Sequence, residues 1–319
     1  MSTLVTWAFT ILAAIMLFLH GLASFSEEVT RLGGERLRTI LRKATRPDWR
    51  GAITGALATA VVQSSSAVTS MAVGLAHNKT VSSRGALSIM IGAHVGTTVT
   101  AWLIAFKVAG LGPVFVTLGG LWSLFGPRPW RPYGKPLFYF GIIFLALDLI
   151  SQALAPLATN PQLTEWQAAL DSPALALIFG AVLTALVQSS SVVSGLAVIA
   201  VSDEILVPAV AIWMVAGANI GTTSTALLAS TALDITSRRL ALLNTCSIML
   251  GIVIFATVLQ PVITLILASN LNPSQQVAMV HTVFNLAASI VTLLLLPYFW
   301  PRISRWLHRD AINESSSIS

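Results

Sequence analysis

The chain has 319 residues, of which 55% are hydrophobic and 9% are charged, and its mean hydropathy is +0.82. Soluble globular proteins carry about a quarter charged residues, so this composition excludes a soluble domain and predicts an integral membrane protein. The net charge of +6 is therefore expected to reflect basic loops on one side of a membrane, with no nucleic-acid partner.

Seven apolar stretches are long enough to cross a membrane as helices. In chain order they are residues 4–25, 85–107, 110–126, 137–157, 206–231, 240–260 and 277–300. The first is expected to be a retained helix and not a signal peptide, because no basic segment precedes it. Residues 306–319 are expected to form a short polar cytoplasmic tail.

Two pairs of segments repeat each other at an offset of 125 residues. Residues 55–73 and 180–198 are identical at 12 of 19 positions, and both contain Gln-Ser-Ser-Ser. Residues 92–103 and 217–228 are identical at 8 of 12 positions, and both contain Gly-Thr-Thr. Two motif pairs in one register indicate an internal duplication.

The Gln-Ser-Ser-Ser stretches, 51–76 and 173–200, could each span the membrane once or turn back as a re-entrant helical hairpin. Lysine and arginine concentrate on the cytoplasmic side of membrane proteins. With hairpins and an external N-terminus, 17 of the 18 basic residues fall on that side, whereas two further spans would give a split of 13 to 5. The charge distribution therefore favours hairpins.

This topology predicts two repeats, residues 1–126 and 127–305. The first contains three crossings, and an odd number inverts the second copy. We therefore expect inverted-topology repeats in the plasma (inner) membrane, with the N-terminus outside and the C-terminus in the cytoplasm. Such repeats are typical of secondary transporters.

Polar hairpin tips at membrane depth are costly unless they form hydrogen bonds or bind something. Carbonyls at the end of one half-helix suit a cation, and N–H groups at the start of the next suit an anion. The glycines before each Gly-Thr-Thr are expected to break spans 85–107 and 206–231, so that tips and broken helices form one site. The alternative for these small residues is close helix packing, which is the better interpretation for the glycines alone.

The paired motifs, from about residue 15 to 300, resemble those of the type II sodium-dependent phosphate cotransporters. The sequence from His281 to Asn285 also resembles the family's His-x-x-Phe-Asn helix. The resemblance implies an all-helical membrane transporter, not an enzyme, that couples inorganic phosphate to Na⁺ and needs no other cofactor. A homodimer in contact with membrane lipid fits this interpretation.

The resemblance also implies the site residues. Phosphate would be bound by Gln63, Ser64, Ser65, Ser66, Gln188, Ser189, Ser190, Ser191 and Asn219. Na⁺ would be bound by Ser65, Ser190, Thr97, Thr98, Thr222 and Thr223. Further candidates, each with a structural alternative, are His94, Asp148, His281 and Asn285.

Two positions depart from the family pattern: the family usually has Asn at the position of His94, and its members often carry His at the position of Asn244. Some bacterial relatives continue into a soluble regulatory domain, which we expect to be absent here because a short Ser-rich tail follows the last span.

A charge argument supports coupling independently, provided that the substrate is an anion. Phosphate is largely a dianion near neutral pH, and no lysine or arginine lies in the central part of any predicted span, so a co-bound cation would offset its charge. Transport of another oxyanion, proton coupling and, less favoured, an ion channel are the alternatives. A serine hydrolase is disfavoured because the chain has no Gly-x-Ser-x-Gly elbow.

Overall fold

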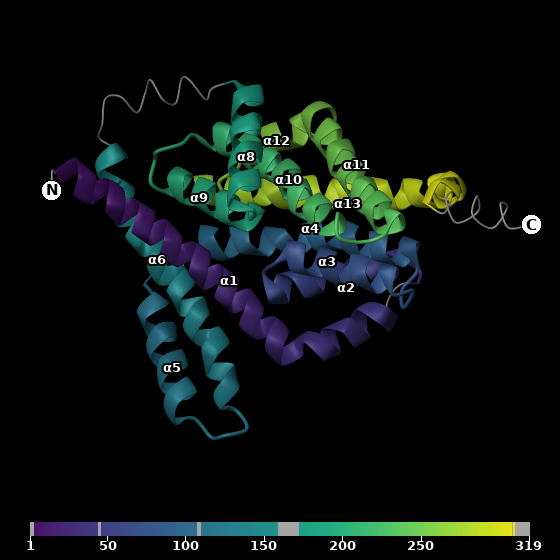
Figure 1. Ribbon diagram of the computed structural model, residues 1–319. Helices are drawn as coiled ribbons and strands as arrows, with labels where there is room; N and C mark the ends of the chain where they lie inside the picture. Colours follow the sequence, from purple (N-terminus) through teal and green to yellow (C-terminus); the bar gives the residue numbers. More distant parts are fainter. Residues whose placement is uncertain (1–2, 44–45, 107–109, 159–171, 308, 310–319) are drawn as a thin grey trace, which may run out of the picture.

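The computed structural model describes residues 3–43, 46–106, 110–158, 172–307 and 309, and its regular secondary structure is helical (Figure 1). The elements are α1 (Thr3–Lys43), α2 (Asp48–Val62), α3 (Ser65–His77), α4 (Ser83–Ala105), α5 (Gly112–Phe125), η1 (Arg131–Tyr133), α6 (Gly134–Ala158), α8 (Pro173–Val187), α9 (Ser190–Ser202), α10 (Pro208–Ser230), α11 (Ile235–Thr257), α12 (Gln260–Leu267) and α13 (Pro273–Leu307).

Within the described residues, six helices are long and apolar enough to cross a membrane: α1, α4, α6, α10, α11 and α13. They correspond to six of the seven predicted spans, as expected of an integral membrane protein. The prediction for 110–126 was wrong in length, because α5 has only 14 residues. At about 1.5 Å per residue it is about 21 Å long, short of a hydrocarbon core of about 30 Å.

Helix α1 differs most from its predicted span of 4–25, because it continues without a break for 41 residues. It packs antiparallel to α6: Trp7 Nε1 donates to the Ala153 carbonyl at 2.8 Å, and Lys135 Nζ lies 3.3 Å from Glu28 Oε1. Helix α5 packs on α6, and α5 with the adjoining end of α6 extends away from the remaining helices (Figure 1).

The segments around Gly-Thr-Thr are unbroken helices, which corrects the predicted breaks in 85–107 and 206–231. Their glycines serve close packing instead. A Cβ added at Gly92 would lie 1.8 Å from the Ala52 carbonyl oxygen, and one at Gly217 would lie 1.9 Å from the Leu177 carbonyl oxygen. The residues of the second contact lie 125 positions after those of the first, so α8 packs on α10 in the same way as α2 packs on α4.

These contacts also give the helix directions. Gly92 meets Ala52 and Gly96 meets Ala56, so α2 and α4 run in the same direction. Helix α3, which connects them, must therefore bring the chain back toward the start of α4. The same reasoning applies to α8, α9 and α10, because Gly217 and Gly221 meet α8 in the same register.

Helix α13 lies beside α4 and α11 and runs opposite to both. Along α4, the Ser289 hydroxyl donates to the Ile91 carbonyl at 3.1 Å. Trp102 Nε1 donates to the Thr282 hydroxyl at 2.9 Å. Residue numbers therefore increase along α4 as they decrease along α13, so the two helices are antiparallel. Along α11, Arg239 Nη1 donates to the Trp306 carbonyl at 2.8 Å, whereas Phe255 packs on Phe284.

Helices α10 and α11 are antiparallel, because only residues 231–234 join them and Trp213, near the start of α10, packs on Phe255, near the end of α11. Most of the connection between α6 and α8 and most of the predicted tail 306–319 lie outside the described residues. The short helix α12 lies in the connection between α11 and α13.

Candidate functional site

Both Gln-Ser-Ser-Ser motifs interrupt a helix at the same place. Helix α2 ends before Gln63 and α8 ends before Gln188, and these glutamines adopt left-handed backbone conformations with φ of 57° and 58°. Their N–H groups donate to the carbonyls of Thr59 and Thr184 at 2.7 Å and 2.6 Å. Glycine is the usual residue in such a cap, so a glutamine kept there points to a use for its side chain.

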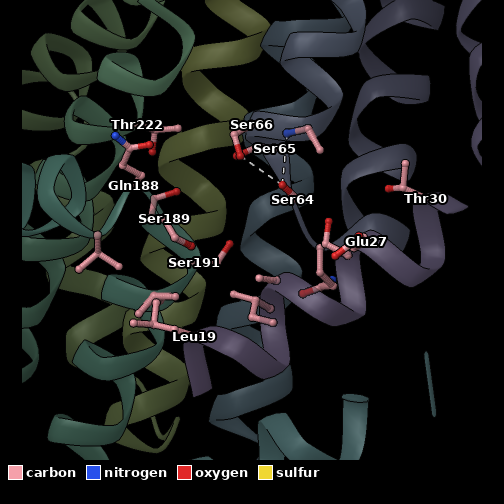
Figure 2. A pocket seen from close by; sticks show the side chains of 18 of the residues that line it. Leu19, Glu27, Thr30, Ser64, Ser65, Ser66, Gln188, Ser189, Ser191 and Thr222 are labelled. Atoms are coloured by element: carbon pink, nitrogen blue, oxygen red, sulfur yellow. Dashed lines mark hydrogen bonds between the residues drawn. The ribbon is translucent and has the colours of Figure 1, made fainter. Parts of the chain in front are cut away.

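The two tips face one cavity of about 830 Å³ (Figure 2). It unites eight of the nine predicted phosphate ligands: Gln63, Ser64, Ser65, Ser66, Gln188, Ser189, Ser190 and Ser191. Thr222 of α10 lines it as well. Residues 125 positions apart thus share one site, as a functional interpretation of the repeat requires.

The cavity is lined by several neutral hydrogen-bond donors, namely serine hydroxyls and backbone N–H groups. Helices α3 and α9 begin at its wall with Ser65 and Ser190, which are 6% and 5% exposed. The Ser64 hydroxyl accepts from the N–H of Ala67 at 3.2 Å and lies 3.2 Å from the Ser66 hydroxyl. Free N–H groups and the dipole at two helix starts favour an anion, and hydroxyl oxygens can also bind a hard cation.

The third wall of the cavity is α1, which was not predicted to take part. The lining stripe consists of Leu19, Leu22, Ala23, Ser26, Glu27, Thr30 and Arg31. Their spacing of three and four residues along one helix face was the signal in the sequence, hidden because the predicted span stopped at residue 25. Arg31 thus lies at this wall, beyond the predicted span 4–25. The charge argument for a co-bound cation considered only the central parts of the predicted spans, so it did not take this basic residue into account.

Asn219, the ninth predicted phosphate ligand, lies elsewhere, in a smaller cavity of about 20 Å³ that His94 and Asn285 also line. This volume fits a water molecule. His94 Nε2 lies 3.1 Å from Asn244 Oδ1, so the two departures from the family pattern are hydrogen-bonding partners.

Other predicted site residues form hydrogen bonds within their own helices. The hydroxyls of Thr97, Thr98 and Thr222 donate to the carbonyls of Ala93, Val95 and Ala218. Thr97, Thr98 and Thr223 lie outside the lining of the larger cavity.

The remaining candidates also lie outside the lining of that cavity. Asp148 accepts a hydrogen bond from the N–H of Gly110 at 3.1 Å, before α5. Asn285 Nδ2 donates to the backbone carbonyl of His281 at 2.9 Å, whereas both ring nitrogens of His281 are buried without a hydrogen-bond partner among the described residues.

Among curated proteins, relatives match over nearly the whole chain. "Putative inorganic phosphate export protein YjbB" of Salmonella typhimurium is 29% identical over 301 residues, which is 92% of this chain and 55% of the relative. The protein of the same name in Escherichia coli K12 is 28% identical, over 94% of this chain and 55% of the relative. The chain thus spans about half the length of these relatives.

"Uncharacterized protein YqeW" of Bacillus subtilis is 26% identical over 90% of this chain and 94% of its own length. No solved structure matches the chain. A family model described as Na⁺/Pi-cotransporter matches twice in tandem, at residues 17–152 and 150–296, in agreement with the duplication. Because the two matches cover most of its length, the chain belongs to the Na⁺/Pi-cotransporter family.

Proposed function

We propose that the protein is a secondary transporter that moves inorganic phosphate across the membrane together with Na⁺. The observation that carries the proposal is the meeting of both Gln-Ser-Ser-Ser tips at one cavity. Helix N-termini and hydroxyls there suit an oxyanion, while hydroxyl and carbonyl oxygens suit Na⁺. Membership of a family described as Na⁺/Pi-cotransporters supports both ligands.

In this proposal, α2–α3 and α8–α9 are re-entrant hairpins in two inverted repeats. Their helices have 15, 13, 15 and 13 residues, about 20 Å each, which is too short to cross a bilayer. The contacts above support the inversion: α4 opposes α13, α13 opposes α11 and α11 opposes α10, so α4 and α10 run in opposite directions. Two tips that approach one site from opposite sides suit alternating access.

The names of two relatives favour a second candidate, phosphate export. A symporter follows the sum of both gradients, so an inward Na⁺ gradient drives uptake, whereas export needs a sufficient outward phosphate gradient. Both directions can use the same cavity.

Transport of labelled phosphate by proteoliposomes tests the proposal. We expect accumulation above the external concentration under an inward Na⁺ gradient, and none when choline replaces Na⁺. Ser65→Ala and Ser190→Ala should each slow this transport about tenfold or more, since each removes a hydroxyl donor at a helix start. Phosphate movement that ignores the Na⁺ gradient would refute coupling, and competition by sulfate or arsenate would identify another oxyanion as substrate.

A further inference from the structure

The cavity contains charged side chains that the two tips do not supply. Glu27 and Arg31 project from α1, together with Ser26 and Thr30 (Figure 2 labels Glu27 and Thr30). All four line the cavity and lie on one face of α1. The hydroxyl of Thr30 is buried and has no hydrogen-bond partner among the described residues. This part of α1 is therefore polar, and one of its hydroxyls is free to form a hydrogen bond within the described structure.

Arg31 is the basic residue among those that line the cavity. Its guanidinium binds the carboxylate of Glu28, through Nε at 2.9 Å and also through Nη2. Glu28 accepts from Lys135 on α6 as well, at 3.3 Å, and its side chain is 14% exposed against 54% for Arg31. The Glu28 carboxylate thus lies between two cations, whereas more than half of the Arg31 side chain is exposed.

A guanidinium is a planar fork of five N–H donors that matches the geometry of phosphate. The bond to Glu28 uses only part of this fork. An oxyanion between the tips and α1 would meet neutral donors on one side and this charge on the other. We infer that Arg31 is the fixed positive charge that binds the oxyanion in this cavity, and that Glu28 competes with the oxyanion for it.

This inference rests on the proposed function and adds a third element, α1, to the two hairpins as a source of substrate ligands. It also predicts opposite effects from the two partners of one ion pair. Loss of Arg31 removes a ligand of the oxyanion, whereas loss of the Glu28 charge removes its competitor. If the pair only held α1 in place, both changes would act in the same direction.

The same helix provides a matched control. Arg38 binds Glu35 at 3.1 Å with the same three-residue spacing, seven residues further along α1, and neither residue lines the cavity. Arg38→Gln removes an identical charge from the same helix but leaves the cavity unchanged. It therefore measures the general effect of net charge on phosphate binding.

The test is calorimetric titration of the purified full chain with inorganic phosphate in the presence of Na⁺. We expect Arg31→Gln to weaken binding about tenfold, the lower value for a hydrogen bond to a charged group, because Arg31 is half exposed. Arg31→Lys should fall between the wild type and Arg31→Gln, since it keeps the charge but not the fork. Glu28→Gln should tighten binding, and Arg38→Gln should match the wild type.

The outcomes separate the two proposals. If the wild type does not bind phosphate, the proposed function fails and this inference fails with it. If the wild type binds phosphate and Arg31→Gln binds it equally well, or if Arg38→Gln weakens binding as much, the inference about Arg31 is wrong while the proposed function stands. Weaker binding by Glu28→Gln would likewise show that the ion pair is structural.

Discussion

The two Gln-Ser-Ser-Ser tips have the same four residues and the same backbone conformation at the glutamine, but their side chains have different surroundings. At the first tip Gln63 is 7% exposed, and its Oε1 accepts a hydrogen bond from Thr100 of α4 at 2.7 Å. At the second tip Gln188 is exposed to the cavity. Thr225, which corresponds to Thr100, instead donates to the Thr222 carbonyl of its own helix.

The serines that start the returning helices differ in the same way. Ser64 caps α3 with its hydroxyl, whereas Ser189 makes no capping bond within the described part of the chain. The duplication therefore specifies the backbone of both tips, and the neighbouring helix determines which side chains remain available. Gln63 of the first tip is held by α4, whereas Gln188 of the second tip stays exposed in the cavity.

The helix packing next to the tips should tolerate an added side-chain carbon equally poorly in both repeats. Gly92→Ala and Gly217→Ala each place a Cβ within 2 Å of a carbonyl oxygen, so α2 or α8 must move away. We expect each change to lower the free energy of unfolding by about 3 kcal/mol or more, measured by thermal or denaturant unfolding in detergent.

The matched control is Gly74→Ala in α3, where nothing lies within 4 Å of an added Cβ. It should stabilise the protein by up to about 1 kcal/mol through helix propensity. A Gly217→Ala variant as stable as the wild type would mean that the second repeat is packed more loosely than the first.

The sequence predicted the duplication, the polar tips and six of the seven spans, because these depend on motif identity and local hydrophobicity. It misjudged the glycines of α4 and α10, since a Gly-x-x-x-Gly face is compatible with both a broken helix and a close contact, and only the partner helix distinguishes them. It also missed the α1 wall. Polarity after residue 25 resembles the end of a span, although α1 continues to Lys43.

The difference between the tips could not be predicted from two identical motifs. It depends on contacts between residues far apart in the chain, such as Thr100 with Gln63, which one sequence does not reveal. The same holds for His94 and Asn244, which are separate departures in the sequence and one hydrogen bond in the structure.

Substituting alanine for each tip glutamine should affect phosphate binding at one tip and the free energy of unfolding at the other. Gln188→Ala is expected to weaken phosphate binding about fivefold and to leave unfolding unchanged, because its side chain faces the cavity. Gln63→Ala should lower the free energy of unfolding by about 1 kcal/mol, because the Thr100 hydroxyl loses its acceptor. Calorimetry and thermal unfolding on the same preparations measure both quantities.

Two threonine variants serve as controls for that comparison. Thr100→Val should reproduce the stability loss of Gln63→Ala, whereas Thr225→Val should change little, since its hydroxyl serves only its own helix. Equal losses of phosphate binding in Gln63→Ala and Gln188→Ala would show that both glutamines bind phosphate, and that the contact of Gln63 with Thr100 does not keep it from the ligand.

The ends of α3 and α9 differ in a weaker, pH-dependent contact. His77, at the end of α3, lies 2.9 Å from Asp234, which caps α11. The position that corresponds to His77 at the end of α9 is Ser202. Burial opposes ionisation of the Asp234 carboxyl, but hydrogen bonds from Ser237 and His77 outweigh it and hold the pKa of Asp234 below its usual value.

A lowered pKa means that the ionised carboxyl stabilises the fold above its unfolded-state pKa of about 4 and that this stabilisation is lost as the pH falls through the lower folded-state value. Both side chains are at least 40% exposed, so solvent screening limits the effect to about 0.5 kcal/mol. Asp234→Asn keeps a capping residue without the charge. Thermal unfolding from pH 7 to pH 3 should show a small advantage of the wild type that begins to shrink below about pH 4 and is lost as the pH falls through the lower folded-state pKa. An advantage that does not shrink between about pH 5 and pH 3 would show that the contribution of Asp234 does not depend on its charge.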